Sequence, residues 1–168
     1  MIDHYIYEVP NFVEHKKNLI DKILKIPNNP LIMDNGESLQ HTDWNLPKKM
    51  QREYLNYFNS EILPNFASNF CNTTNSKEIG ISKVWFQVYG KGDSHDKHNH
   101  PGCHFTNVFY IKLPNNLKTK IKTFTENLET EISEGNILTF PACYFHFSPK
   151  NTSEDEKIII AFNLDIIK

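Results

Sequence analysis

The spacing of apolar residues changes near residue 80 of this 168-residue chain, and this change limits the fold more than any other feature. Upstream of it, apolar residues recur at every third or fourth position, which is the period of one helix face. Downstream, Val84, Phe86 and Val88 are separated by single residues, which is the period of a β-strand. We therefore expect helical support over residues 1–79 and a β-rich core over residues 80–168.

Two helices are expected in the N-terminal part. The first spans residues 11–26 and is stopped by Pro27. The second spans about residues 48–66, and Pro64 is expected to kink or end it because proline lacks the backbone N–H of a helix interior. A polar loop joins the two helices.

The C-terminal part contains many short apolar runs separated by turn signals such as Pro114-Asn115-Asn116 and Glu134-Gly135-Asn136. Many short strands at regular spacing are typical of a sandwich or barrel, and a double-stranded β-helix, or jelly roll, fits their number. We expect one domain over residues 1–168, mainly β, with about two supporting helices. After the strand near residue 84, the expected strands are 105–113, 119–125, 128–132, 136–140, 144–147 and 157–166.

Composition narrows the classes of partner. The chain has 18 basic and 20 acidic residues and a net charge of −2, which disfavours binding to nucleic acid or to a membrane surface. No apolar run approaches the roughly 20 residues of a membrane span, and no secretory signal is visible at the N-terminus. The three cysteines form no CxxC motif. We therefore expect a cytoplasmic protein.

Four of the eight histidines, His95, His98, His100 and His104, lie in one short window. In a strand, residues i and i+2 point to the same face, so His98 and His100 are expected to project together. His146, late in the β region, is the expected third ligand of one metal ion. Imidazole suits iron, zinc, copper and nickel, so the ligand type alone does not fix the metal.

Other residues near this window have alternative interpretations. Asp96 lies two residues before His98 and is an alternative carboxylate ligand. His95 and His104 are interpreted as neighbours of the site. Cys103 and Cys143 flank it, and we favour small buried apolar residues over thiolate ligands for both.

The β part resembles the 2-oxoglutarate- and Fe(II)-dependent oxygenases of the prolyl-hydroxylase-like type. The resemblance covers about residues 85–165 and rests on a set of motifs in a fixed order. Among those oxygenases, it is most similar to a small subfamily of phages and marine bacteria. The motifs are Tyr89-Gly-x-Gly, His98-x-His100-Pro-Gly, Val108-Phe-Tyr-Ile-x-x-Pro114, Glu134-Gly-Asn-Ile137, Phe140-Pro141 with His146, and Lys157-Ile-Ile-Ile-Ala-Phe-Asn163.

The resemblance implies a role for particular residues. His98 and His146 match the first and last iron ligands, and His100 stands where most of the superfamily has a carboxylate. Three neutral imidazoles would leave Fe(II) its full +2 charge, which should weaken its retention against zinc or nickel and raise its electrophilicity. For 2-oxoglutarate, the resemblance assigns Lys157 and Tyr110 to its distal carboxylate; the further pocket residues it implies are Tyr89 and Asn163.

The activity that the resemblance implies is hydroxylation of an unidentified small-molecule or peptide substrate with O2, releasing succinate and CO2, with ascorbate as an activator. If a phage encodes the protein, the resemblance places it in the host cytoplasm. Two alternatives stay open: a three-histidine cupin-type dioxygenase that does not use 2-oxoglutarate, and a non-enzymatic jelly-roll binding or structural module. The loop with His41, Asp43 and Trp44 and the loop after Gly92 are expected to face the substrate.

Overall fold

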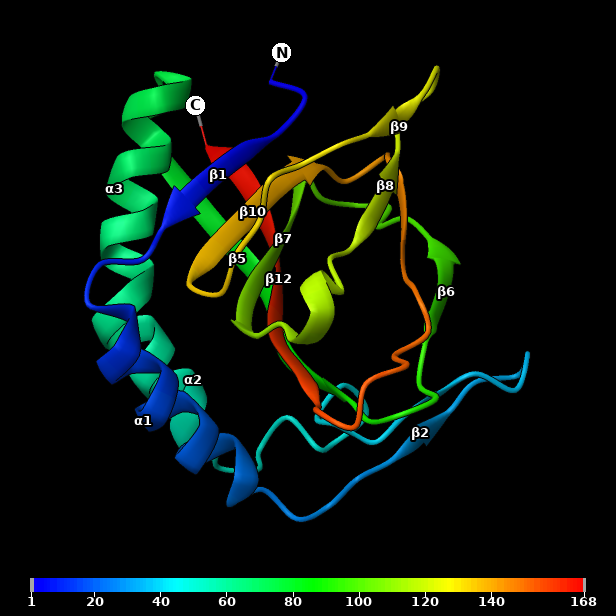
Figure 1. Ribbon diagram of the computed structural model, residues 1–168. Helices are drawn as coiled ribbons and strands as arrows, with labels where there is room; N and C mark the ends of the chain where they lie inside the picture. The colour runs from blue at the N-terminus through cyan, green and yellow to red at the C-terminus, as the bar shows by residue number, and fades with distance from the viewer. Residues whose placement is uncertain (1, 168) are drawn as a thin grey trace.

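Two antiparallel β-sheets enclose the interior of the computed structural model, which describes residues 2–167 (Figure 1). The larger sheet has six strands in the order β1-β10-β7-β12-β5-β4. They are β1 (Tyr5–Glu8), β10 (Asn136–Pro141), β7 (Phe105–Lys112), β12 (Lys157–Ile167), β5 (Glu78–Tyr89) and β4 (His41–Thr42). The smaller sheet has the order β6-β11-β8-β9, formed by β6 (His95–His98), β11 (Phe145–Ser148), β8 (Lys120–Lys122) and β9 (Asn127–Leu128). A separate hairpin pairs β2 (Leu31–Ile32) with β3 (Ser38–Leu39).

The helices lie on one side of the larger sheet (Figure 1). They are α1 (Phe12–Leu24), α2 (Glu53–Tyr57), the π-helical turn η1 (Phe58–Ile62) and α3 (Leu63–Thr74), and a 3-10 turn, η2 (Pro114–Asn116), follows β7. The sequence predicted that Pro64 would kink or end the second helix. The helical segment instead continues past Pro64 to Thr74. Pro64 occupies the first turn of α3, just after η1, where its missing N–H leaves no helical hydrogen bond unmade. Within residues 2–167, every helix is too short or too polar to cross a bilayer.

The alternation of β12 gives the larger sheet two different faces. Ile160 and Phe162 belong to the cluster that packs on the helices, and the Phe162 ring lies 5.4 Å from Phe58 and 5.5 Å from Phe66. Residues between them in the sequence point to the opposite face. Because β5 and β7 alternate in the same way, one inner face collects the chemically distinctive side chains, namely Trp85, Gln87, Tyr89, Tyr110, Lys157 and Asn163.

The N-terminal part is less purely helical than predicted. β1 pairs with β10, and β4 pairs with β5, so residues before 80 supply two strands of the larger sheet. Both strands are too short to establish a period in the sequence. The predicted strands 119–125 and 128–132 are also longer than β8 and β9, because Thr123 closes a tight turn by donating from its hydroxyl to the Glu126 carbonyl. The mainly β architecture with N-terminal helical support is confirmed.

Asp43 holds the helical layer to the larger sheet. Its carboxylate accepts hydrogen bonds from the Tyr54 hydroxyl at 2.5 Å and from the Phe86 backbone N–H at 2.9 Å, and it lies 3.3 Å from Arg52 Nε. Burial raises the pKa of Asp43, while those hydrogen bonds and the Arg52 charge lower it. Asp43 and His41 are buried and line neither of the cavities next to the clustered histidines, so the expectation that they face the substrate is wrong.

Replacing Asp43 by asparagine is expected to lower the free energy of unfolding by about 2–4 kcal/mol, because Arg52 then loses its buried counter-charge. Urea denaturation measures this change. The matched control is Asp34→Asn, which removes an exposed carboxylate and should change the free energy by less than about 0.5 kcal/mol. Equal effects of the two substitutions would contradict the structural role of Asp43.

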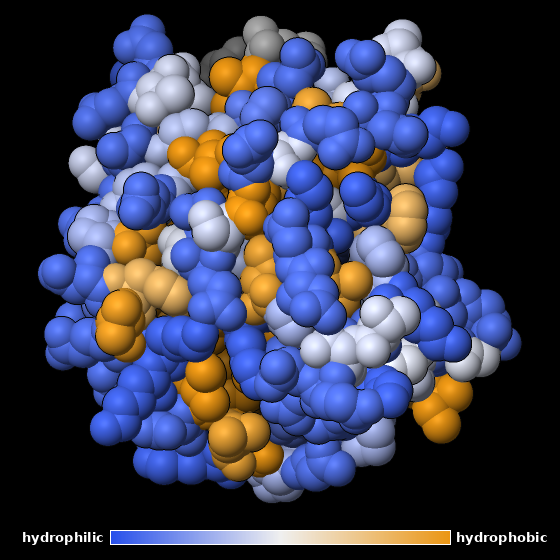
Figure 2. Space-filling view, in the orientation of Figure 1, coloured by the Kyte–Doolittle hydropathy of each residue, from blue (hydrophilic) through white to orange (hydrophobic). Residues whose placement is uncertain are grey.

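Exposed apolar side chains are dispersed over the surface. On the face seen in Figure 2, hydrophobic residues form small groups separated by hydrophilic ones. The most exposed large examples, Val13, Ile32 and Phe124, lie in three different segments of the chain. Scattered apolar residues of this kind are ordinary for a folded chain.

Candidate functional site

His98 and His146 meet across the smaller sheet. β6 and β11 are antiparallel, and His98 is the direct partner of His146 in their register. The two ring centroids are 4.3 Å apart. Directly opposed residues of an antiparallel pair bring their side chains close together on one face, so the strand pairing itself creates half of a metal site.

His100 joins this pair from a loop. β6 ends at His98, so the strand alternation that we expected does not reach His100. Instead the His100 backbone N–H donates to the Ala142 carbonyl at 3.0 Å, which ties the loop to the turn before β11. The His100 ring centroid lies 5.2 Å from that of His98 and 5.1 Å from that of His146. One ring nitrogen from each histidine lies within 4.8 Å of the others, which suits three ligands of one ion.

Burial favours the neutral form of two of these imidazoles, those of His100 and His146. Burial, followed by the neighbouring charges of His98 and His100, holds the pKa of His146 well below its usual range. Burial and His98 lower the pKa of His100 to about 4, although the Asn163 amide opposes this shift. A neutral imidazole keeps the lone pair that binds a metal, so this donor set fits a divalent transition-metal ion.

Asp96 and His95 form a second group that shares His98. The His95 and His98 ring centroids are 4.3 Å apart, and His95 Nε2 lies 3.9 Å from Asp96 Oδ1. His98 Nδ1 is 2.8 Å from the Asp96 carbonyl oxygen, and since a carbonyl only accepts, Nδ1 carries the hydrogen and Nε2 is free to bind a metal. The Asp96 carboxylate clusters with His95 and His98, but not with His100 and His146.

Three further sequence expectations have different outcomes. His104 accepts a hydrogen bond from the Ile166 N–H and contacts Asp165. It belongs to neither of the two histidine groups. Cys143 is exposed and Cys103 is partly buried, so the interpretation of both as buried apolar residues is wrong for Cys143. Cys143 lies in the turn that follows β10, where its side chain faces solvent.

Lys157 lies at the start of β12, inside the protein. It is fully buried, and its Nζ donates to the Ser148 hydroxyl at 2.8 Å. The same nitrogen lies 4.9 Å from the Tyr89 ring centroid and 5.9 Å from that of Tyr110. Among residues 2–167, no carboxylate lies within ion-pair distance of this ammonium. A buried cation without a counter-charge is costly, so the pocket is suited to an anion.

The two tyrosines beside Lys157 have different hydrogen bonds. The Tyr110 hydroxyl oxygen accepts from the Thr119 backbone N–H at 3.1 Å, which leaves its own hydrogen free to donate. Burial raises the pKa of Tyr110 to about 12, so it stays a donor near neutral pH. The Tyr89 hydroxyl donates to Gln87 Oε1 at 2.9 Å and is therefore already used.

A narrow internal cavity joins the anion pocket to the histidines. Its lining includes Tyr89, Thr119 and Ser148 from the pocket and His98, His100 and His146 from the metal site. Ser148 is two residues after His146 on β11, so the same strand face carries a candidate metal ligand and the hydrogen-bond partner of Lys157. The two-residue spacing of His146 and Ser148 is visible in the sequence, but we did not predict Ser148 as a site residue.

The buried ammonium predicts a specific pH dependence of stability. Burial lowers the pKa of Lys157 from its ordinary 10.5 to about 7, so between these values the unfolded chain binds a proton that the folded chain does not. The free energy of unfolding should therefore rise as the pH increases from about 7 toward 10, by at most roughly 5 kcal/mol. Urea denaturation across this range measures the slope. Lys157→Met should remove most of it, and an unchanged slope in this variant would contradict the assignment.

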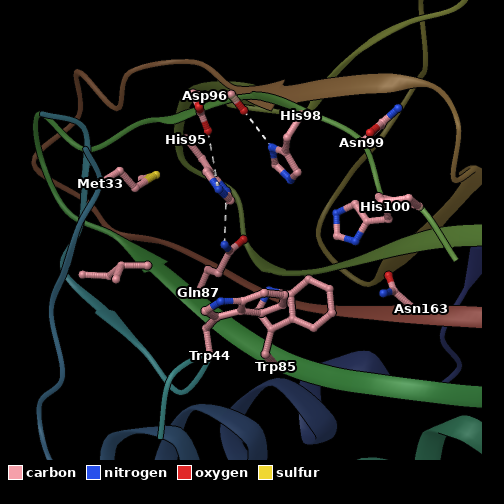
Figure 3. A pocket seen from close by; sticks show the side chains of 12 residues that line it. Met33, Trp44, Trp85, Gln87, His95, Asp96, His98, Asn99, His100 and Asn163 are labelled. Atoms are coloured by element: carbon pink, nitrogen blue, oxygen red, sulfur yellow. Dashed lines mark hydrogen bonds and ion pairs between the residues drawn. The ribbon is translucent and has the colours of Figure 1, made fainter. Parts of the chain in front are cut away.

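An outer cleft of about 520 Å³ opens next to the histidines (Figure 3). Trp44 from the loop after β4 and Trp85 from β5 lie together on one wall, and Trp44 is the part of the predicted substrate loop that reaches the cleft. Asn163 also lies here, beside His100 in Figure 3, at the opposite end of the inner face from Lys157. Sequence reasoning missed Trp85 and Gln87, although their alternation with Phe86 places them on the inner face.

Comparisons with solved structures place this fold. An oxidoreductase of the 2-oxoglutarate–Fe(II) oxygenase family from Burkholderia pseudomallei matches with a TM-score of 0.71 at 13% identity, over 97% of this chain and 85% of that one. A viral collagen prolyl hydroxylase from Paramecium Bursaria Chlorella virus-1, in complex with 2-oxoglutarate, matches with a TM-score of 0.61 at 15% identity, over 99% of this chain and 97% of that one. A Trichoplax adhaerens prolyl hydroxylase with a peptide fragment of hypoxia inducible factor matches with a TM-score of 0.64 at 14% identity, over 97% of this chain and 84% of that one.

The sequence itself matches no protein-family model and no curated protein. At these identities, the structural likeness establishes the fold. The predicted jelly roll with helical support is confirmed, and its similar structures include 2-oxoglutarate–Fe(II) oxygenases and prolyl hydroxylases. The chemistry of this chain must be argued from its own site.

Proposed function

We propose that this protein is an Fe(II)- and 2-oxoglutarate-dependent dioxygenase that hydroxylates a small-molecule or peptide substrate. One observation carries the proposal. The internal cavity is lined by the three histidines and by Ser148, and the Ser148 hydroxyl accepts a hydrogen bond at 2.8 Å from the fully buried Lys157, which has no carboxylate partner among residues 2–167. A dicarboxylate that binds a metal through one end and Lys157 through the other matches this arrangement.

His98, His100 and His146 would hold the iron in this proposal. Their nitrogens are close enough for one ion, and three ligands leave other coordination positions open. When bound, Fe(II) and 2-oxoglutarate would activate O2, one oxygen atom of which goes to succinate, formed with release of CO2, and the other to the hydroxylated product. The cross-strand pair and the His100 backbone bond orient the imidazoles before any ligand arrives.

Lys157 and Tyr110 would bind the distal carboxylate of 2-oxoglutarate. The ammonium offers a charge-assisted hydrogen bond, and the free hydrogen of the Tyr110 hydroxyl offers a second donor. Bound anion would favour the charged form of Lys157, so binding should take up a proton above about pH 7. Tyr89 packs under the ammonium as an aromatic wall, and Asn163 contributes at the cleft end of the site.

The direct test is succinate formation by the purified protein with Fe(II), 2-oxoglutarate, O2 and ascorbate. Without added substrate, we expect slow formation of succinate that is not coupled to hydroxylation and that ascorbate stimulates. We expect no succinate when Zn(II) replaces Fe(II). The Lys157→Met variant is the matched negative control. Failure of both iron and 2-oxoglutarate to bind would overturn the proposal.

The absence of a carboxylate from the three-histidine group favours one alternative, a cupin-type dioxygenase that acts on its substrate without 2-oxoglutarate. The Lys157→Met variant discriminates the two proposals. It should abolish 2-oxoglutarate-dependent turnover under the main proposal and should change the activity little under the alternative. The main proposal also includes membership of the phage and marine bacterial subfamily, a single domain over residues 1–168 and a cytoplasmic location.

A further inference from the structure

The outer cleft has a chemical character that restricts its ligand. It lies beside His98 and His100, so a molecule bound in it faces the metal site. Trp44 and Trp85 meet edge to face, with ring centroids 4.8 Å apart. The His100 ring is stacked on Trp85 at 5.6 Å. These three rings form a wall that suits an aromatic group, because aromatic pairs favour such offset and edge-on contacts.

The opposite wall is apolar and adaptable. Leu31 and Met33 come from the β2–β3 hairpin, and Figure 3 shows the Met33 sulfur directed into the cleft. A methionine sulfur contacts aromatic rings favourably and adjusts to their shape. The cleft volume, about 520 Å³, is in the range of small-molecule sites.

The charge of the cleft disfavours anions. Asp96 is its one ionised side chain, and no lysine or arginine among residues 2–167 lines it. Lys83 lies outside the lining, with its ammonium over the Trp44 ring. In the metal-free protein, a carboxylate or phosphate on the ligand would therefore find no cationic side chain in the lining of the cleft and would be repelled by Asp96.

One hydrogen-bond acceptor in the cleft is unused. Asn163 Oδ1 lies beside His100 and partly offsets the burial that lowers the pKa of that imidazole, yet it is buried and makes no hydrogen bond of normal geometry with residues 2–167, whereas Gln87 is engaged by Tyr89 and His95. A buried acceptor of this kind is stabilised by a ligand that supplies a donor.

We propose that the outer cleft binds an aromatic group that carries an amide or amine N–H and no negative charge. Asn163 Oδ1 accepts the N–H, and the indole wall holds the ring. This inference rests on the proposed function in that it describes the substrate of the same site.

The chain contains only two tryptophans, and both line this cleft, so intrinsic tryptophan fluorescence reports its occupancy directly. The probes are phenylacetamide, methyl phenylacetate and phenylacetate, which share one ring and differ in the donor and the charge. Phenylacetamide should bind about 2- to 10-fold more tightly than the ester, which lacks the donor, and at least about 10-fold more tightly than the carboxylate.

Two variants assign the discrimination to residues. Asn163→Leu should make the amide and the ester bind equally. Asp96→Asn should reduce the ratio of the affinities for phenylacetamide and phenylacetate by about 2- to 5-fold. The matched control Asp21→Asn, on the exposed side of α1, should leave this ratio unchanged. If Asn163→Leu weakens metal binding and leaves the ligand ranking intact, Asn163 acts on His100 and its assignment as the acceptor is wrong.

The titrations are run on the full chain with Fe(II) and 2-oxoglutarate under argon, and in parallel on metal-free protein. Failure of 2-oxoglutarate to bind would overturn the proposed function, yet the metal-free titration would still test the cleft. Equal or tighter binding of phenylacetate in both states would overturn the inference.

Discussion

Replacing Lys157 by methionine is expected to weaken 2-oxoglutarate binding by about 10- to 100-fold and to leave metal binding unchanged. The range corresponds to the loss of one charge-assisted hydrogen bond to an anion, about 1.5–3 kcal/mol. Methionine has a similar length and no charge, so it fills the pocket without the cost of a buried ammonium. The variant should therefore fold at least as stably as the original chain near neutral pH.

Calorimetric titration of the metal-loaded protein with 2-oxoglutarate measures the change. Lys112→Met is the matched control, since it removes a partly exposed lysine that pairs with Asp155 on the surface. A separate titration with Co(II) establishes that the histidine site is intact. Unchanged 2-oxoglutarate affinity in Lys157→Met would contradict the anion pocket and favour the cupin-type alternative.

Replacing His98 by alanine is expected to reduce metal affinity by at least about 100-fold. His98 is the member shared by both histidine groups, so neither the three-histidine set nor the set with His95 and Asp96 stays complete without it. Co(II) titration followed by visible absorption, with elemental analysis of the purified protein, measures the loss. His104→Ala is the control, because His104 belongs to neither group.

Two more variants decide which third ligand completes the site. His100→Ala should lower the Co(II) affinity nearly as much as His98→Ala, whereas Asp96→Asn should change it by less than about 3-fold. The reverse pattern would assign the metal to His95, Asp96 and His98. Retention of stoichiometric metal by His98→Ala would contradict both arrangements.

The sequence predicted the parts of this site that follow from strand alternation. Once residues 84–89 and 157–166 are recognised as strands, a period of two places Tyr89, Lys157 and Asn163 on one face without further information. His98 and His146 could be paired on chemical grounds, because two imidazoles far apart in the sequence need a common ion. The structure brings these two rings together.

The rest depends on contacts that no local pattern encodes. His100 is placed by a backbone bond to Ala142, forty-two residues away, and not by the strand that we expected. The role of Asp43 follows from its contacts with Tyr54 and Phe86, which its neighbours in the sequence do not reveal. Short pairings such as β1 and β4 are fixed by the edges that they cover, so their own composition predicts them poorly.

The two halves of the site belong to parts of the fold with unequal resistance to local opening. β6, which carries His98, is a four-residue edge strand that pairs, among residues 2–167, with β11 alone, and their register is interrupted between His146 and Ser148. β12, which begins at Lys157, pairs with β5 over its whole length and with β7 over Ile158–Leu164. Short edge strands open at a lower free-energy cost than central strands, so amide hydrogens of β6 should exchange much faster than those of β12. In the proposed site, Lys157 therefore lies on the more stable strand, and a bound metal ion would stabilise the protein mainly by suppressing the local opening of the β6 edge.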